Sequence, residues 1–153
     1  MTSEEETRMA DIAPQVRCYV PLTPERARAL LDQGSLLGDL VAFVVTDSVR
    51  RSDPGGDDEG WEYAALQDAA AYCLEQSEPV LVAAADVARD TIDDSGPTGS
   101  RVVVHGPISM PRIASLHVGD DLVGAAEELS QVDDVIELSW YDATELADVC
   151  ALL

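Results

Sequence analysis

The sequence contains no lysine and no asparagine, and it has only two histidines, three cysteines and one phenylalanine among 153 residues. Without lysine the chain cannot form a GxxxxGK[ST] phosphate loop, because that motif places a lysine on the phosphates. All nine basic residues are arginine, and thirty acidic residues give a net charge of −21. A surface this acidic repels phosphate backbones and anionic membranes, which argues against direct binding to nucleic acid or to a membrane.

Long apolar runs are also missing. The longest cover about half a dozen positions, whereas a membrane-spanning helix needs roughly 20. Residues 1–11 are polar and acidic, and they lack the basic and apolar regions of a signal peptide. The cysteines, at positions 18, 73 and 150, are too few and too scattered for a disulfide framework, and we expect buried free thiols. These features predict a cytoplasmic protein.

The length fits one domain that can bury a core without metals or disulfides. Residues 1–14 are charged and precede the first apolar alternation, so we expect an acidic, disordered N-terminal segment. Residues 15–153 are then predicted to form a single α/β domain.

The apolar periodicities predict the element order β-α-β-α-β-β-β-α-β. The expected strands cover residues 16–20, 40–45, 80–85, 101–104, 113–118 and 135–141. The expected helices cover residues 23–33, 59–76 and 121–131, with a further helical turn or two in 143–153. This order favours an α/β (or α+β) fold with a single mixed sheet and helices packed on it.

Strand direction follows from the same order. Two consecutive βαβ units predict parallel strands. The unbroken apolar character of residues 40–45 and 80–85 predicts that both strands are interior and covered on both faces. Residues 49–60 are predicted to be a loop, because Pro54, Gly55 and Gly56 break regular structure.

The predicted helix 59–76 is apolar on two sides. At 100° per residue one arc forms the expected core face; it contains Tyr63, Leu66, Ala70, Cys73 and Leu74. A second arc, close to the opposite side, contains Trp61, Ala65 and Tyr72. Either another element covers this second arc, most plausibly the C-terminal segment 146–153, or it binds another protein or a second copy of the chain. Aromatic side chains with an acidic border are typical of such contact surfaces.

A search for catalytic motifs identifies one weak set of candidates. There is no GxGxxG motif after a strand, no GxSxG elbow and no cysteine pair with metal-binding spacing. Asp86 ends a predicted strand, and adjacent antiparallel strands could bring it near His105 and His117. Such a trio could bind zinc or perform acid–base chemistry. The alternative is two partly exposed histidines with ordinary hydrogen-bond partners, and we predict no cofactor and no tightly bound metal.

Three hypotheses about function follow. The leading one is a non-catalytic interaction or regulatory module that binds a protein partner, or forms a homo-oligomer, through Trp61, Ala65 and Tyr72. The second is a small metal-dependent or acid–base hydrolase that uses Asp86, His105 and His117. The third is an acidic mimic of nucleic acid that occupies a basic protein.

Several segments together resemble a known family. They are, in chain order, RCYVP (17–21), AFVVTDSVR (42–50), DEGWEYAA (58–65), VAAADV (82–87), VVVHGP (102–107), IASLHV (113–118) and LSWY (138–141). The chain is similar in these segments to a family of uncharacterised small proteins found mainly in actinobacteria, and the similarity extends over about residues 16–146. The chain is shorter than that family between residues 87 and 101 and again before residue 135. The resemblance implies a bacterial cytosolic protein, and it brings no activity, cofactor or catalytic residue.

Overall fold

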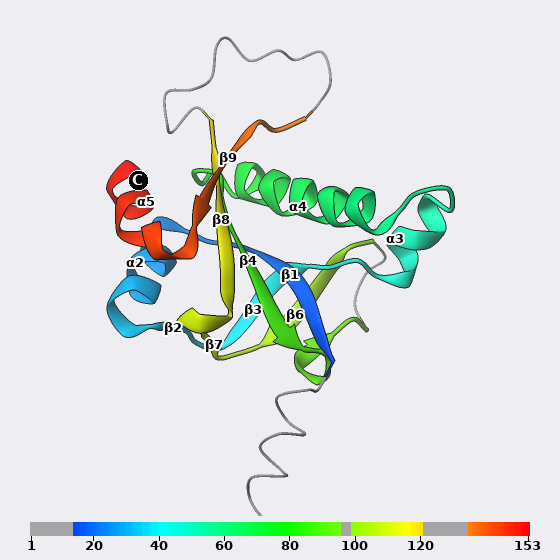
Figure 1. Cartoon of the computed structure of the whole chain (residues 1–153), viewed down its shortest axis with the longest axis horizontal. Coiled ribbons are helices and arrows are strands. Elements are labelled where there is room, and N and C mark those ends of the chain that lie inside the picture. Colours follow the sequence, from blue (N-terminus) through cyan, green and yellow to red (C-terminus); the bar gives the residue numbers. More distant parts are fainter. Residues whose placement is uncertain (1–13, 96–98, 121–134) are drawn as a thin grey trace, which may run out of the picture.

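The computed structural model describes residues 14–95, 99–120 and 135–153, and its centre is a seven-stranded sheet (Figure 1). The strand order is β5-β6-β3-β1-β4-β8-β9, and every pairing in it is antiparallel. The strands are β1 (Gln15–Pro21), β3 (Asp39–Phe43), β4 (Leu81–Ala88), β5 (Ile92–Asp93), β6 (Arg101–His105), β8 (Ile113–Gly119) and β9 (Leu138–Asp142). A second sheet of two short strands joins β2 (Ser35–Leu36) and β7 (Ile108–Ser109).

The helices begin and end where the capping residues of the sequence indicate. They are α2 (Pro24–Gln33), α3 (Asp47–Ser52), α4 (Asp58–Glu75) and α5 (Leu146–Leu152), with single turns η1 (Arg89–Thr91), η2 (Met110–Arg112) and η3 (Ala143–Glu145). The Thr23 side chain caps α2, and Gly34 ends that helix with a φ of 77°. The Asp57 side chain accepts a hydrogen bond from the Gly60 amide at the start of α4. Over the described ranges, we find no helix both long enough and apolar enough to cross a membrane.

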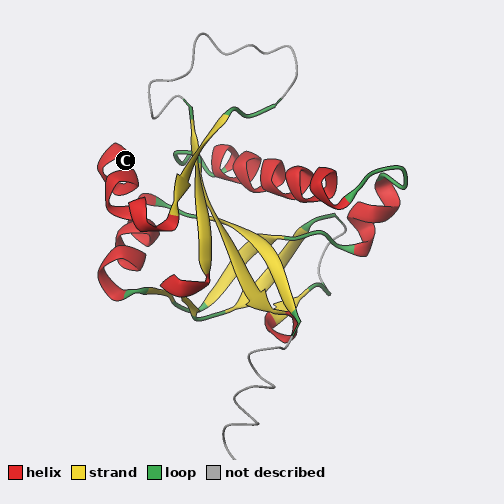
Figure 2. Ribbon diagram, in the orientation of Figure 1, coloured by secondary structure: helices red, strands yellow, loops and turns green. Residues whose placement is uncertain are grey.

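The sheet separates two apolar layers (Figure 2). Side chains alternate along β1, so Cys18 and Val20 face one layer while Tyr19 faces the other. The first layer lies against α2 and α5, and the second lies against α4. The helix α4 approaches the sheet through small residues, among them Ala65 and Ala69, which are fully buried. Small side chains on both sides of this contact allow close packing between helix and sheet.

Sequence and structure agree on a single main sheet with helices packed on it. Because the strands pair only antiparallel in the described residues, the fold is the α+β form of the two expected classes. The strands predicted at 40–45 and 80–85, now β3 and β4, are both interior, as predicted. They also run in the same direction, since each pairs antiparallel with β1, which lies between them.

The parallel pairing expected from the first βαβ unit is wrong. Strand β1 pairs antiparallel with β3, with Tyr19 opposite Phe43. The physical reason is the position of α2, which contacts β2 and α5 instead of crossing the sheet from end to end. The chain therefore re-enters the sheet from the end at which it left, and the next strand must run the opposite way.

The loop predicted at 49–60 is also shorter than expected. Helix α3 occupies its first part, because the Thr46 hydroxyl caps the helix by accepting from the Val49 amide at 3.2 Å. The breakers Pro54 to Gly56 confine the irregular backbone to residues 53–57. The terminal helical segment is confirmed as η3 and α5. The predicted helix 121–131 and residues 1–13 of the predicted disordered segment lie outside the described residues.

We expect Gly106→Ala to lower the free energy of unfolding by about 1–3 kcal/mol, the usual effect of overpacking. A Cβ at this position would lie 2.5 Å from the carbonyl oxygen of Gly38 and 3.1 Å from that of Leu36. Both are backbone atoms that cannot rotate away. Urea unfolding followed by circular dichroism measures the change, with Gly55→Ala as the matched control because its Cβ would meet nothing within 4 Å. Equal stabilities for the two variants would show that the backbones do not approach this closely.

Candidate functional site

The three predicted catalytic residues do not meet. His105 lies on β6 and His117 on β8, and the strands β3, β1 and β4 lie between them. The proposed trio of Asp86, His105 and His117 is therefore wrong as a single site. The error follows from the strand order: the histidine-bearing strands are close in sequence, but they add to opposite sides of the central strands.

Each member of the trio has its own partner instead. The Nδ1 atom of His105 lies 2.8 Å from a carboxylate oxygen of Asp39, its register partner on β3. That hydrogen bond, together with the charge of Asp39, raises the pKa of His105 above its ordinary value of 6.5. Both side chains are exposed, so the pair is a surface contact.

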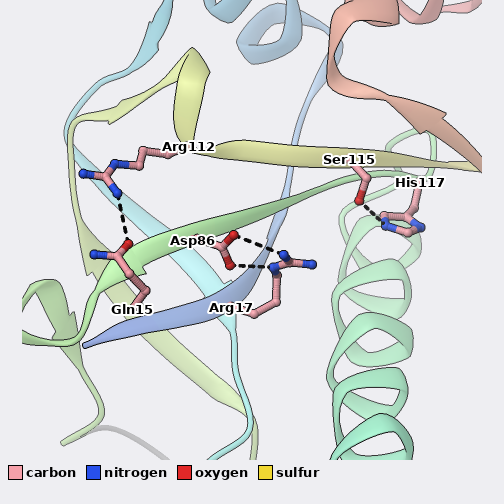
Figure 3. A network of polar contacts seen from close by, with 6 residues as sticks. All are labelled: Gln15, Arg17, Asp86, Arg112, Ser115 and His117. Carbon is pink, nitrogen blue, oxygen red and sulfur yellow. Dashed lines mark hydrogen bonds and ion pairs between the residues drawn. The ribbon is translucent and has the colours of Figure 1, made fainter. Parts of the chain in front are cut away.

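Asp86 and His117 lie on the face of the sheet that carries α4 (Figure 3). Arg17 on β1 donates two hydrogen bonds to the Asp86 carboxylate, at 2.7 and 3.1 Å. The His117 Nε2 atom lies 3.0 Å from the Ser115 hydroxyl on the same strand. Burial, and then the charge of Arg17, lower the pKa of His117. Over residues 14–95, 99–120 and 135–153, no group of three or more histidine, cysteine or carboxylate side chains is arranged to hold a metal ion.

Other parts of the described chain cover the apolar stripe on α4 only in part, because Trp61 and Tyr72 are half-buried. Ala65 is 0% exposed, so it does not form part of a contact surface in this structure. The Tyr72 ring lies 5.8 Å from the Phe43 ring of β3, and the Trp61 indole N–H donates to the Asp53 carbonyl oxygen at 3.1 Å. The predicted cover, segment 146–153, is wrong, because α5 packs in the other apolar layer.

The predicted core face of α4 is corrected in the same way. Tyr63 and Leu74, which the periodicity places in the core, are 50% and 55% exposed. Three positions are fully buried: Ala70 from the predicted core face, Ala65 from the second arc, and Ala69, which lies between the two arcs. The helix thus packs through its small residues, and the larger apolar side chains lie at the sides of the contact or in solvent.

A cavity of about 530 Å³ is lined by residues of α3 and of the segments at one end of the sheet. Four of the nine arginines of the chain line it: Arg50, Arg51, Arg89 and Arg101. We call it the arginine pocket. The rest of its lining comprises Val16, Val44, Val45, Thr46, Asp47, Ser48, Ile92, Asp94 and Gly99.

The sheet topology brings these arginines together. Strands β3 and β4 run in the same direction, and both finish at this end of the sheet. Strands β1 and β6 begin there, because Gln15 pairs with Ala88 and Arg101 pairs with Phe43. Arg50 and Arg51 follow the end of β3, and Arg89 follows the end of β4 directly. Segments that are remote in sequence therefore converge at one edge.

Hydrogen bonds between loops fix the wall of the pocket. The Thr46 hydroxyl donates to the Gly99 carbonyl oxygen at 2.6 Å, and the Gly99 amide donates to the Ser48 hydroxyl at 3.0 Å. The Val44 amide donates to the Ser100 carbonyl oxygen at 2.9 Å. These bonds join the start of α3 to the segment that leads into β6, so both sides of the wall are held to one another.

The arginines divide into two pairs by their surroundings. The Arg50 guanidinium lies over the Trp61 ring at 5.9 Å, and that of Arg101 lies over the Tyr72 ring at 5.1 Å. The side chains of Arg51 and Arg89 have no hydrogen-bond or ion-pair partner among the described residues. Two arginines of the lining thus have their guanidinium groups over aromatic rings of α4, and the side chains of the other two have no partner among the described residues.

Sequence reasoning missed the arginine pocket. Its four arginines come from three separate stretches of the chain, and no short motif contains them. One signal was present: arginines follow both of the unbroken apolar strands, at 50–51 and at 89. Because ligand sites in layered folds gather where strands end, that placement could have been used.

Comparisons with known proteins add a family and no activity. A family model described as a family of unknown function (DUF6912) matches residues 16–150. Comparison with curated proteins and with solved structures gave no match.

We expect the two histidines to titrate on opposite sides of 6.5, with the pKa of His105 above that value and the pKa of His117 below it. The physical causes differ, since Asp39 stabilises the charged ring of His105 while burial destabilises that of His117. An NMR titration of the ring protons gives both values. In Asp39→Asn the pKa of His105 should fall toward 6.5 while that of His117 stays unchanged. If both histidines titrate with the same pKa in the wild type, the contact of His105 with Asp39 and the burial of His117 do not hold in solution.

Proposed function

We propose that this chain, which belongs to the family DUF6912, is a cytoplasmic, non-catalytic module that binds a small polyanion in the arginine pocket. The proposal is drawn from the chain's own residues. The observation that carries the proposal is the gathering of four of nine arginines around one cavity in a chain of net charge −21. Its three free thiols are compatible with a reducing compartment.

The charge distribution favours a small ligand over a large one. Four arginines and two aspartates give the lining a net charge of +2, which leaves −23 on the rest of the chain, since the total is −21. At physiological ionic strength charges are screened over about 8 Å, so the local arginines dominate inside the cavity. A long polyanion such as nucleic acid would also meet the acidic exterior and be repelled.

The chemistry of the lining favours phosphate or carboxylate groups. Arginine presents several N–H donors in a planar fork that matches both groups, and such charge-assisted hydrogen bonds are among the strong ones in proteins. The cavity volume lies within the range of about 300–1,000 Å³ that is common for small-molecule sites. Val16, Val44 and Ile92 form an apolar part of the wall, which suits a ligand with an organic portion.

The hydroxyl groups in the pocket support a binding role. Those of Thr46 and Ser48 are used to hold the Gly99 backbone. The described lining offers cations, and we see in it no hydroxyl paired with a general base.

The hypotheses of a protein partner, a homo-oligomer and a nucleic-acid mimic stay predictions, and no specific observation favours them over the anion site.

Isothermal titration calorimetry with inorganic tripolyphosphate, at low and at high salt, tests the proposal. We expect saturable binding that weakens with salt, because the attraction is electrostatic. Arg51→Ala and Arg89→Ala should each weaken binding about tenfold or more, which corresponds to the loss of one charge-assisted hydrogen bond of about 1.5–3 kcal/mol.

Arg28→Ala is the matched control, because it removes the same charge from an exposed site on α2 that is not part of the pocket lining. Its affinity should stay within about twofold of the wild type, as expected for a screened, distant charge. Absence of binding by the wild type, or equal losses in all three variants, would contradict a specific site at the arginine pocket.

A further inference from the structure

We propose that Trp61 and Tyr72 are positioning residues that hold Arg50 and Arg101 in place for the anion. This inference rests on the proposed function, and it assigns a role to the apolar stripe of α4. Neither aromatic residue lines the arginine pocket, so both would act through the arginines that they support.

Trp61 fixes the corner that carries two of the pocket arginines. Its indole N–H donates to the carbonyl oxygen of Asp53, the residue that directly follows α3. Its ring face lies under the guanidinium of Arg50, which belongs to α3. One side chain therefore holds both the end of the short helix and a cation on it.

The turn between α3 and α4 is built closely around this indole. A Cβ added at Gly56 would lie 2.7 Å from the Trp61 Nε1 atom and closer still to the Asp53 carboxylate. Any residue other than glycine would displace the ring or the turn. The position of α3, and with it that of Arg50 and Arg51, thus depends on how the indole packs.

The Asp47 carboxylate also contacts Arg50, at 3.0 Å, but it cannot hold it alone. The two side chains, Arg50 and Asp47, are 44% and 84% exposed, and exposed pairs of this kind fix a side chain weakly. A guanidinium over an indole face gains a further attraction from the ring quadrupole. The ring and the carboxylate therefore restrict the position of the Arg50 cation together.

Tyr72 holds Arg101 in an equivalent way from the other end of α4. Its ring lies under the Arg101 guanidinium and against the Phe43 ring, and Phe43 is the register partner of Arg101 across β3 and β6. One turn earlier on α4, the Asp68 carboxylate accepts a hydrogen bond from the Ser100 hydroxyl at 2.6 Å. Tyr72 and Asp68 therefore hold two successive residues at the start of β6.

These contacts account for the unusual pattern of α4. Trp61 and Tyr72 project from nearly the same side of the helix, and the fully buried Ala65 between them lets that side approach the sheet. Restricting two arginines in advance reduces the side-chain entropy lost when an anion binds. Arg51 and Arg89, whose side chains have no partner among the described residues, supply the further cations of the proposed site.

The test has two readouts, and the first needs no ligand. NMR relaxation of the arginine side-chain Nε–Hε groups in the free protein should show that Arg50 and Arg101 are restricted while Arg28 is mobile. Trp61→Leu should make Arg50 mobile and Tyr72→Leu should do the same for Arg101. Tyr72→Phe keeps its ring and should preserve the restriction of Arg101, whereas Trp61→Phe keeps a ring but loses the N–H bond to Asp53 and should restrict Arg50 only in part. Equal mobility of Arg50 with and without the Trp61 ring would overturn the proposal.

The second readout is affinity for tripolyphosphate. Trp61→Leu and Tyr72→Leu should weaken it about two- to fivefold, the effect of one exposed cation–π contact. Tyr72→Phe should restore the affinity, and Trp61→Phe should restore it in part. Tyr63→Leu is the control, since Tyr63 is an exposed aromatic residue on the same helix. Unchanged affinity in the folded leucine variants would overturn the proposal. If a leucine variant does not fold, Tyr72→Phe still decides, because a mobile Arg101 in it also contradicts the proposal.

Tryptophan fluorescence adds a local signal, because the chain has only two tryptophans. Trp140 is 62% exposed on β9, at the opposite edge of the sheet from β6, so Trp140→Phe leaves Trp61 as the single reporter. Its emission should change with the same midpoint as the calorimetric titration.

If the wild type restricts Arg50 and Arg101 but does not bind tripolyphosphate, the proposed function fails while the positioning of the arginines stands. If it binds tripolyphosphate while both arginines are mobile, the positioning role fails and the proposed function stands.

Discussion

The antiparallel pairing of β1 with both of its neighbours is the constraint on which the rest of this structure depends. The strand pairs with β4 along its whole length, from Gln15 opposite Ala88 to Pro21 opposite Val82, and with β3 on its other side. Its alternating side chains supply both apolar layers. Because β1 separates two strands of the same direction, their ends meet at one edge of the sheet. The arginine pocket exists because the arginines that follow those strands arrive at that edge.

Two electrostatic environments follow from this arrangement. Most of the surface is acidic, and it keeps large polyanions away. The arginine pocket is locally cationic, and its walls are tied together by the hydrogen bonds of Thr46 and Ser48 to Gly99. Under the proposed function this contrast favours a small anion, because a long polyanion would also meet the acidic exterior. The same contrast explains why composition alone indicated no anion site: the net charge averages over both environments.

Local patterns in the sequence were sufficient for most elements and insufficient for their partners. The helix expected at 59–76 is α4 (Asp58–Glu75), because the Asp57 cap and the breakers before it act within a few residues. The direction of β3 relative to β1 could not be obtained in this way. It depends on where α2 packs, and a helical periodicity is the same whether a helix crosses a sheet or lies beside its end.

The site shows the same limit more strongly. The sequence correctly placed Trp61 and Tyr72 on one side of a helix, but a helical wheel does not reveal what covers that side. Arg50 and Arg101, which cover part of it, lie on a short helix and on a strand whose positions follow from long-range pairing. The histidine trio failed for the same reason, since closeness along the chain was taken as closeness between strands.

Trp61 and Tyr72 are eleven positions apart, which corresponds to about 16 Å along the axis of α4 at about 1.5 Å per residue. The two rings therefore contact arginines of two different elements, Arg50 of α3 and Arg101 of β6, from one continuous helix. A single rigid helix thus relates the position of a short helix to that of a sheet strand, although the two elements are remote in the sequence.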